Sequence, residues 1–174
     1  MLCFLTTDCD ISSEMIREAL LEVTRVSFNR ISVDGDTSTN DTCLVLANGL
    51  AGNPSITSQG ADYDAFLEAL RALCVEMARR IAADGEGAKH MITCTVEGAT
   101  DEAQAERIAK SVISSTLTKA AIFGADANWG RVLCAMGYSG EAFDPDKVDV
   151  SFISAAGSVA VCAQGRGLDF DEEA

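Results

Sequence analysis

One stretch constrains the fold more than any other, because a strongly polar segment runs directly into an apolar one. Residues 34–42 hold three aspartates, four hydroxyl side chains and one asparagine, and residues 43–47 are apolar. This order predicts a polar loop that leads into a buried strand, which ends at a second turn, Asn48 and Gly49. Loops fixed by a strand often carry function, yet Asp, Asn, Ser and Gly also dominate ordinary turns. Both interpretations fit this stretch taken alone.

Apolar residues at helical spacing predict three helices. One helix is expected over residues 62–82. A second is expected from a cap among residues 10–13 to about Phe28, and a third from the cap Thr100 to near Lys119. Short apolar or alternating runs predict strands at residues 2–5, 43–47, 89–97, 132–136, 148–152 and 159–162, the last two forming a hairpin. Strands that alternate with helices indicate an α/β class, and 174 residues suit a single domain over 1–174 that ends in an acidic tail, 169–174.

Charge and cysteine content exclude several classes of function. The net charge of −14 argues against binding nucleic acid by phosphate neutralisation. No apolar run is long enough to span a membrane, and the first residues lack the basic region of a signal peptide. The seven cysteines form no C-x-x-C pair, and His90 is the only histidine. We therefore expect reduced thiols, no metal and a reducing, cytoplasmic compartment.

Two further segments are candidates for a site. Glu86 lies between Gly85 and Gly87, so a tight bend should present its carboxylate; a solvated turn explains the same pattern, and the spacing of a phosphate-binding loop is absent. The only tryptophan lies between Asn128 and Arg131, which suggests a pocket, although a buried tryptophan is also ordinary packing.

Taken together, these stretches resemble a known family. Residues 34–41, 84–88 and 126–131, with Gly137-Tyr-Ser-Gly140, are similar in order and separation to motifs of the ornithine acetyltransferases, the bifunctional glutamate N-acetyltransferases of arginine biosynthesis. The opening Met-Leu-Cys-Phe-Leu-Thr-Thr-Asp resembles the start of that family's β chain. The resemblance covers essentially the whole sequence.

The resemblance implies an α/β fold with sheets sandwiched between helices, in a precursor that cuts itself into an α and a β chain. The new N-terminal threonine of the β chain is the nucleophile, and its own α-amine can act as the base. Acetyl passes from N-acetylornithine to glutamate through an acyl-threonine. No cofactor is implied, although acetyl-CoA can be a co-substrate.

This sequence departs from the family pattern at both ends. The nucleophile would stand immediately before Met1 and is not in this chain, and neither Thr6 nor Thr7 matches its position. The β chain of the family also continues beyond the position of Ala174, and the α chain is a separate partner. We therefore expect this chain to be most of a β chain, inactive without the α chain, in a heterotetramer of two α and two β chains.

The resemblance carries one substrate-binding residue onto this sequence, Glu86, whose carboxylate suits contact with an ammonium group of ornithine or with the amine of the nucleophile. No catalytic residue is expected within the chain. The remaining candidate pocket residues are polar members of the same motifs: Asp34, Asp36, Asn40, Asp41, Asn128 and Arg131.

Two other functions stay open. A self-cleaving aminopeptidase or amidase would hydrolyse the acyl-enzyme, and the test is whether glutamate speeds the loss of acetyl from the enzyme. A non-catalytic regulatory domain is the other alternative. A threonine codon immediately before Met1, within a longer reading frame, would exclude it.

Overall fold

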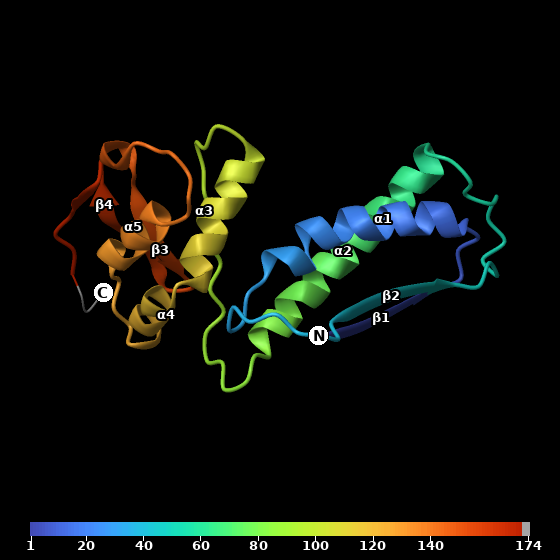
Figure 1. Ribbon diagram of the computed structural model, residues 1–174, viewed down its shortest axis with the longest axis horizontal. Coiled ribbons are helices and arrows are strands. Elements are labelled where there is room, and N and C mark those ends of the chain that lie inside the picture. Colours follow the sequence, from blue (N-terminus) through green and yellow to red (C-terminus); the bar gives the residue numbers. More distant parts are fainter. Residues whose placement is uncertain (172–174) are drawn as a thin grey trace. The chain divides into compact units, whose positions relative to one another are not determined.

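The computed structural model describes residues 1–171, which group into two compact units, one of Met1–Ala88 and one that begins at Lys89. Both units combine helices with a small sheet, so the predicted α/β class is confirmed (Figure 1). The sequence predicted a single domain, whereas the contacts form two units; one domain over 1–174 stays a prediction. Of the predicted acidic tail, residues 172–174 lie outside the described residues.

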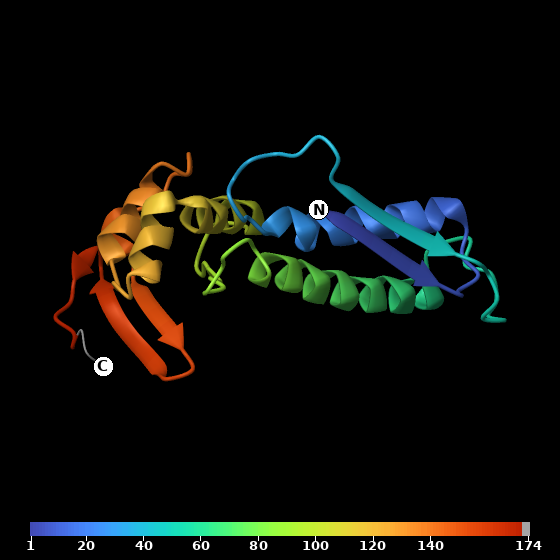
Figure 2. The same ribbon diagram turned by 90° about the horizontal axis from the view of Figure 1, so that it is seen from below.

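Unit 1 is a two-stranded parallel sheet covered by two helices. Strands β1 (Leu2–Thr7) and β2 (Thr42–Ala47) pair in register from Leu2 and Thr42 to Thr7 and Ala47. Helices α1 (Ser13–Val26) and α2 (Ala61–Ala83) lie on one face of the sheet (Figures 1 and 2), and a short 3-10 helix, η1 (Phe28–Arg30), follows α1. All four predicted elements of this unit are confirmed.

The helices of unit 1 form where their caps and apolar stripes coincide. Ser12 caps α1 by accepting a hydrogen bond from the Met15 N–H at 3.3 Å. Met15, Ala19 and Val23 then recur every fourth residue and are all buried. The matching stripe of α2 consists of Tyr63, Leu70, Cys74 and Ala78. These two stripes and the inward side chains of the sheet form one core.

The sheet of unit 1 is buried on one face only. Cys3 and Leu5 point into the core, whereas Leu2, Phe4, Leu44 and Leu46 are 66%, 64%, 40% and 56% exposed. The prediction of a buried strand at residues 43–47 is therefore correct for one face. Apolar residues on both sides of a parallel sheet are typical of strands covered on both faces, and helices of this chain cover one.

The predicted strand at residues 89–97 is wrong. This segment alternates between half-buried and exposed side chains, but among the described residues its backbone joins no sheet. Alternation reports which side chains face a surface, whereas a strand also needs a neighbour for its N–H and C=O groups.

The helical part of unit 2 differs from the prediction of one helix from Thr100 to Lys119. Helix α3 (Glu102–Ser114) ends before Ser115, whose extended backbone lets its side chain cap α4 (Thr116–Phe123) by accepting the Thr118 N–H. The cap of α3 is Asp101 rather than Thr100. A serine in an apolar helical pattern can thus end one helix and begin another.

Residues 132–136, predicted as a strand, belong to helix α5 (Trp129–Gly137). The prediction fails because a short apolar run is compatible with a strand or with a helix. Here a side-chain cap at its start stabilises the helix. Asn128 supplies that cap by accepting the Arg131 N–H at 3.1 Å. Within the run, Ala135 is fully buried.

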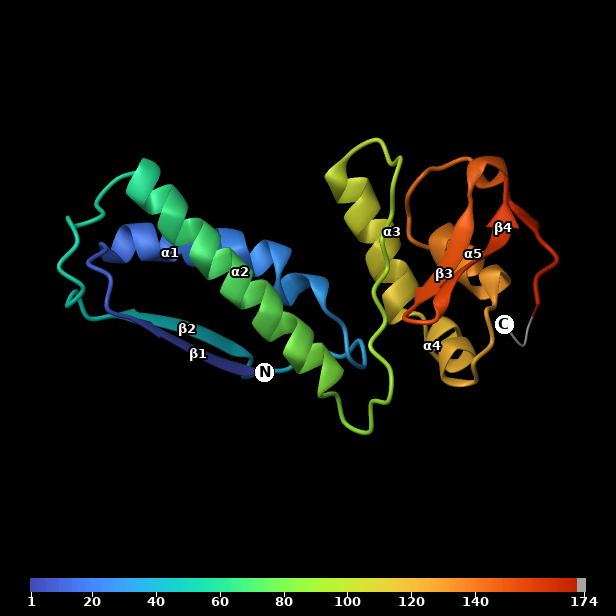
Figure 3. The same ribbon diagram turned by 180° about the vertical axis from the view of Figure 1, so that it is seen from behind.

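The predicted hairpin is confirmed. After the 3-10 turn η2 (Pro145–Lys147), strands β3 (Val150–Ser154), β4 (Gly157–Ala163) and β5 (Arg166–Gly167) form an antiparallel sheet (Figure 3). Val161 and Cys162 of β4 are buried.

Candidate functional site

The polar loop of residues 34–42 is exposed and is shaped by its own side chains. Asp34 Oδ1 accepts the Asp36 N–H at 2.8 Å, and the Ser38 hydroxyl donates to Asn40 Oδ1 at 2.7 Å. The Thr42 hydroxyl donates to the Asn40 carbonyl at 3.1 Å. Such local bonds are common in turns. The loop thus has a defined path up to the first residue of β2.

The end of this loop contacts the start of β1. The backbone nitrogen of Met1 lies 2.5 Å from Asp41 Oδ1, and the Met1 carbonyl accepts the Thr42 N–H at 3.0 Å. Asp41 is therefore the candidate pocket residue that contacts Met1, through the terminal ammonium of the chain.

Glu86 lies on the bend that its glycines predict. The Ala88 N–H donates to the Gly85 carbonyl at 2.8 Å, and Gly87 has a φ of +70°, a left-handed conformation that glycine adopts without strain. Glu86 is exposed, and among the described contacts its carboxylate has no partner. Its role in binding substrate stays a prediction.

The Glu86 bend and the polar loop are neighbours in unit 1. A Cβ atom placed on Gly85 would lie 3.4 Å from Val33 Cγ1, so the bend packs against the residue that precedes Asp34. Two stretches about fifty residues apart in the sequence are thereby brought together. The side chains of the loop and of Glu86 are exposed.

Asn128 and Arg131 belong to unit 2, where their polar groups hold the local fold. Besides capping α5, Asn128 donates to Asp126 Oδ2 at 3.0 Å. The Arg131 guanidinium donates to the Leu117 carbonyl at 3.0 Å and so ties α5 to α4. These contacts explain both residues structurally, and their place in a pocket stays a prediction. The tryptophan between them packs closely on Gly167, because a Cβ there would lie 2.7 Å from the Trp129 ring.

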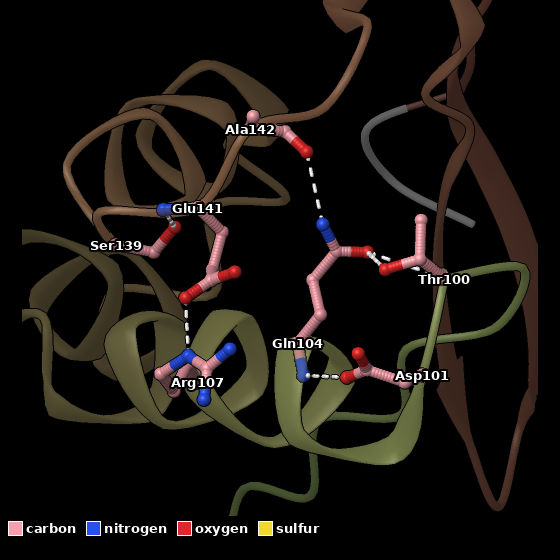
Figure 4. Close-up of polar contacts among 7 residues, drawn as sticks. All are labelled: Thr100, Asp101, Gln104, Arg107, Ser139, Glu141 and Ala142. Atoms are coloured by element: carbon pink, nitrogen blue, oxygen red, sulfur yellow. Dashed lines mark hydrogen bonds and ion pairs between the residues drawn. The ribbon is translucent and has the colours of Figure 1, made fainter.

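Sequence reasoning missed a polar network in unit 2 (Figure 4). Gln104 is 9% exposed, and its side-chain oxygen accepts from the Thr100 N–H and hydroxyl while its amide donates to the Ala142 carbonyl at 2.9 Å. Arg107 also donates to Glu141 in the same segment. The spacing of Asp101 and Gln104 matches a capping box, which is the signal that could have found it. The network fixes residues 139–142 against α3.

The cysteines of unit 1 are core residues. Burial, and next the neighbouring thiols of Cys3 and Cys74, raise the pKa of Cys43 to about 12, and burial raises the pKa of Cys74 to about 11. These thiols are therefore protonated at neutral pH and are poor nucleophiles. The seven cysteines are free thiols.

Residues 1–171 contain neither a cluster suited to a metal ion nor a helix suited to spanning a membrane. In this range, no three His, Cys, Asp or Glu side chains are grouped so that they could hold a metal ion. No helix in the described part of the chain is long and apolar enough to cross a membrane. An open hollow in unit 2 is lined by Asp146, Asp149, Ala163, Gln164 and Arg166, and it contains none of the predicted site residues.

Known proteins match the chain over its full length. The family model of the ArgJ family matches residues 1–174. A Clostridium acetobutylicum protein, arginine biosynthesis bifunctional protein ArgJ 1, is 51% identical over 174 residues, which are 100% of this chain and 43% of that protein. The arginine biosynthesis bifunctional protein ArgJ of Symbiobacterium thermophilum is 52% identical over 174 residues, which are 100% of this chain and 42% of that protein.

A solved structure matches the fold as well. The crystal structure of arginine biosynthesis bifunctional protein ArgJ from Bacillus halodurans, at 2.00 Å resolution, superposes with a TM-score of 0.91 and 42% sequence identity. The match covers 99% of this chain and 79% of that chain. The chain spans about two-fifths of the length of the curated relatives it matches.

Proposed function

Because the chain belongs to the ArgJ family, we propose that it is part of an enzyme that transfers an acetyl group in arginine biosynthesis. The observation that carries this proposal is the family match along all of residues 1–174. In our proposal N-acetylornithine donates the acetyl group, an acyl-threonine forms, and glutamate accepts it. Acetyl-CoA is a second donor in the same scheme, and the enzyme is cytoplasmic.

We further propose that the chain corresponds to the β chain of a cleaved precursor, with the nucleophilic threonine immediately before Met1. The chain matches about two-fifths of a relative's length, and this length fits either the α chain or the β chain of such a protein. The opening residues and the order of the three motifs favour the β chain. The reading frame upstream of Met1 tests this directly, because a codon other than threonine at that position would contradict it.

The open face of the β1–β2 sheet supports an α-chain partner. Phe4 and Leu44 are paired in register, and with Leu2 and Leu46 they form an exposed apolar patch on a parallel sheet. Contiguous apolar patches on folded proteins commonly mark interfaces. We propose that the α chain covers this face, within a heterotetramer of two α and two β chains.

Replacing Leu44 with lysine should weaken the complex, because a charge on the covered face would lose its hydration. Co-purification of the two chains and their native mass measure the effect, with Leu21→Lys, an exposed position on α1, as the matched control. If the 174-residue chain alone is a cooperatively melting monomer, the partner proposal is wrong.

The reaction itself is tested by following the acetyl group. The complete two-chain enzyme is incubated with labelled N-acetylornithine, and label on the threonine that precedes Met1 is measured by peptide mass analysis. We expect glutamate to discharge the label quickly as N-acetylglutamate. Release of free acetate at a rate that glutamate does not change would identify a hydrolase instead.

A further inference from the structure

The open hollow of unit 2 lies where the turn between β4 and β5 packs against the segment around η2. The Gly165 N–H donates to the Val148 carbonyl at 2.9 Å, and the Gln164 N–H donates to Asp149 Oδ1 at 2.8 Å. A Cβ atom on Gly165 would collide with the Pro145 carbonyl oxygen, so the two segments are in close contact. These contacts hold the walls of a hollow of about 500 Å³, a volume in the range of small-molecule sites.

Opposite charges line this hollow without pairing to one another. Its walls include the carboxylates of Asp146 and Asp149 and the guanidinium of Arg166. Within residues 1–171, the Arg166 guanidinium makes no ion pair or hydrogen bond, and the Asp146 carboxylate makes none either. Asp149 uses one of its two oxygens to hold the turn. These three side chains can therefore bind a ligand that carries charges of both signs.

A free α-amino acid with a basic side chain matches this set of charges. A guanidinium binds a carboxylate through two parallel N–H donors, and a carboxylate accepts hydrogen bonds from an ammonium group. One positive and two negative side chains give these walls a net charge of −1, which a ligand with one carboxylate and two cationic groups balances. We propose that the hollow is a binding site for a free basic α-amino acid, whose carboxylate contacts Arg166 and whose cationic groups contact Asp146 and Asp149.

This binding goes beyond acetyl transfer, because it needs neither the nucleophile nor the predicted site residues, none of which lines the hollow. The three charged side chains are exposed, and water and salt weaken the attraction between exposed charges. We therefore expect a weak site with a Kd of about 1 mM, whose occupancy follows the concentration of the free amino acid.

The test measures the binding of labelled L-lysine, as the probe, to the co-purified two-chain protein by equilibrium dialysis. Three relatives of the probe each lack one charge: Nα-acetyl-L-lysine lacks the α-ammonium group, L-norleucine lacks the side-chain ammonium group, and cadaverine lacks the carboxylate. We expect each relative to compete about tenfold more weakly than unlabelled lysine, because each loses one charged hydrogen bond. Cadaverine that competes as well as lysine would show attraction of cations to an acidic surface and would overturn the proposal.

Substitutions test whether the bound lysine lies in the hollow. Arg166→Gln and Asp146→Asn should each raise the Kd about tenfold, whereas Lys147→Ala, at an exposed neighbour that does not line the hollow, should stay within about twofold. An unchanged melting temperature checks that each variant is folded. An unchanged Kd in Arg166→Gln, an equal rise in Lys147→Ala, or no saturable binding to the wild type below about 10 mM overturns the proposal. Normal lysine binding by a protein that transfers no acetyl group contradicts the proposed function instead and leaves this site standing.

Discussion

Replacing Gly165 with alanine should lower the free energy of unfolding by about 3 kcal/mol, because two separate costs add. Gly165 has a φ of +72°, where a side chain is strained. Its Cβ would also lie 2.4 Å from the Pro145 carbonyl oxygen, a backbone atom that cannot rotate away. The Gly165 N–H donates to the Val148 carbonyl at 2.9 Å, so any shift of the turn loses that bond too. Urea unfolding of the co-purified two-chain protein, compared with the wild type under the same conditions, measures the change.

Two other glycines of unit 2 separate these costs. Gly98 has a φ of +73° with nothing near its Cβ position, so Gly98→Ala should lose only about 1 kcal/mol. Gly137 ends α5 with ordinary φ and open space, so Gly137→Ala should be neutral or gain up to about 1 kcal/mol. A Gly165→Ala variant no less stable than Gly98→Ala would show that the contact with Pro145 relaxes freely.

Sequence patterns predicted helix α2 well because its signal is long, and they failed at residues 132–136 and 89–97 for two different reasons. Helix α2 repeats its apolar residues over many turns, so its bounds match the predicted 62–82 within a residue. The run at 132–136 is too short to distinguish a strand from a helix, and its cap, Asn128, decides the matter through one side-chain bond. The segment 89–97 has the alternation of a strand without a partner, which is a property of pairing and not of local sequence.

The site was predictable only in part. The two glycines around Glu86 correctly indicated an exposed bend, because glycine marks backbone that turns tightly. That the bend packs against Val33, beside the polar loop, is a tertiary contact with no local signal. Gln104 combines the two situations. Its capping-box spacing is visible in the sequence, whereas its hydrogen bond to the Ala142 carbonyl depends on a turn 38 residues away.

Under the proposed function, replacing Glu86 with glutamine should remove most acetyl transfer in the proposed two-chain enzyme and leave its stability unchanged. The carboxylate is exposed and has no partner among the described contacts, so its loss should change the free energy of unfolding by less than about 0.5 kcal/mol. A charged hydrogen bond to a substrate ammonium group is stronger, about 1.5–3 kcal/mol, which corresponds to about 10- to 100-fold in kcat/KM. The two effects are separable because they differ several-fold in size.

The measurements are the melting temperature and the rate of acetyl transfer from N-acetylornithine to glutamate. Glu68→Gln, which removes another exposed carboxylate from unit 1 next to Arg71, is the matched control and should leave both quantities unchanged. The neutral amide introduced by Glu86→Gln has nearly the shape of the carboxylate it replaces, so a loss of transfer without a change in melting reports the missing charge. A variant that melts many degrees lower would make Glu86 structural, and transfer at the wild-type rate would remove it from the substrate site.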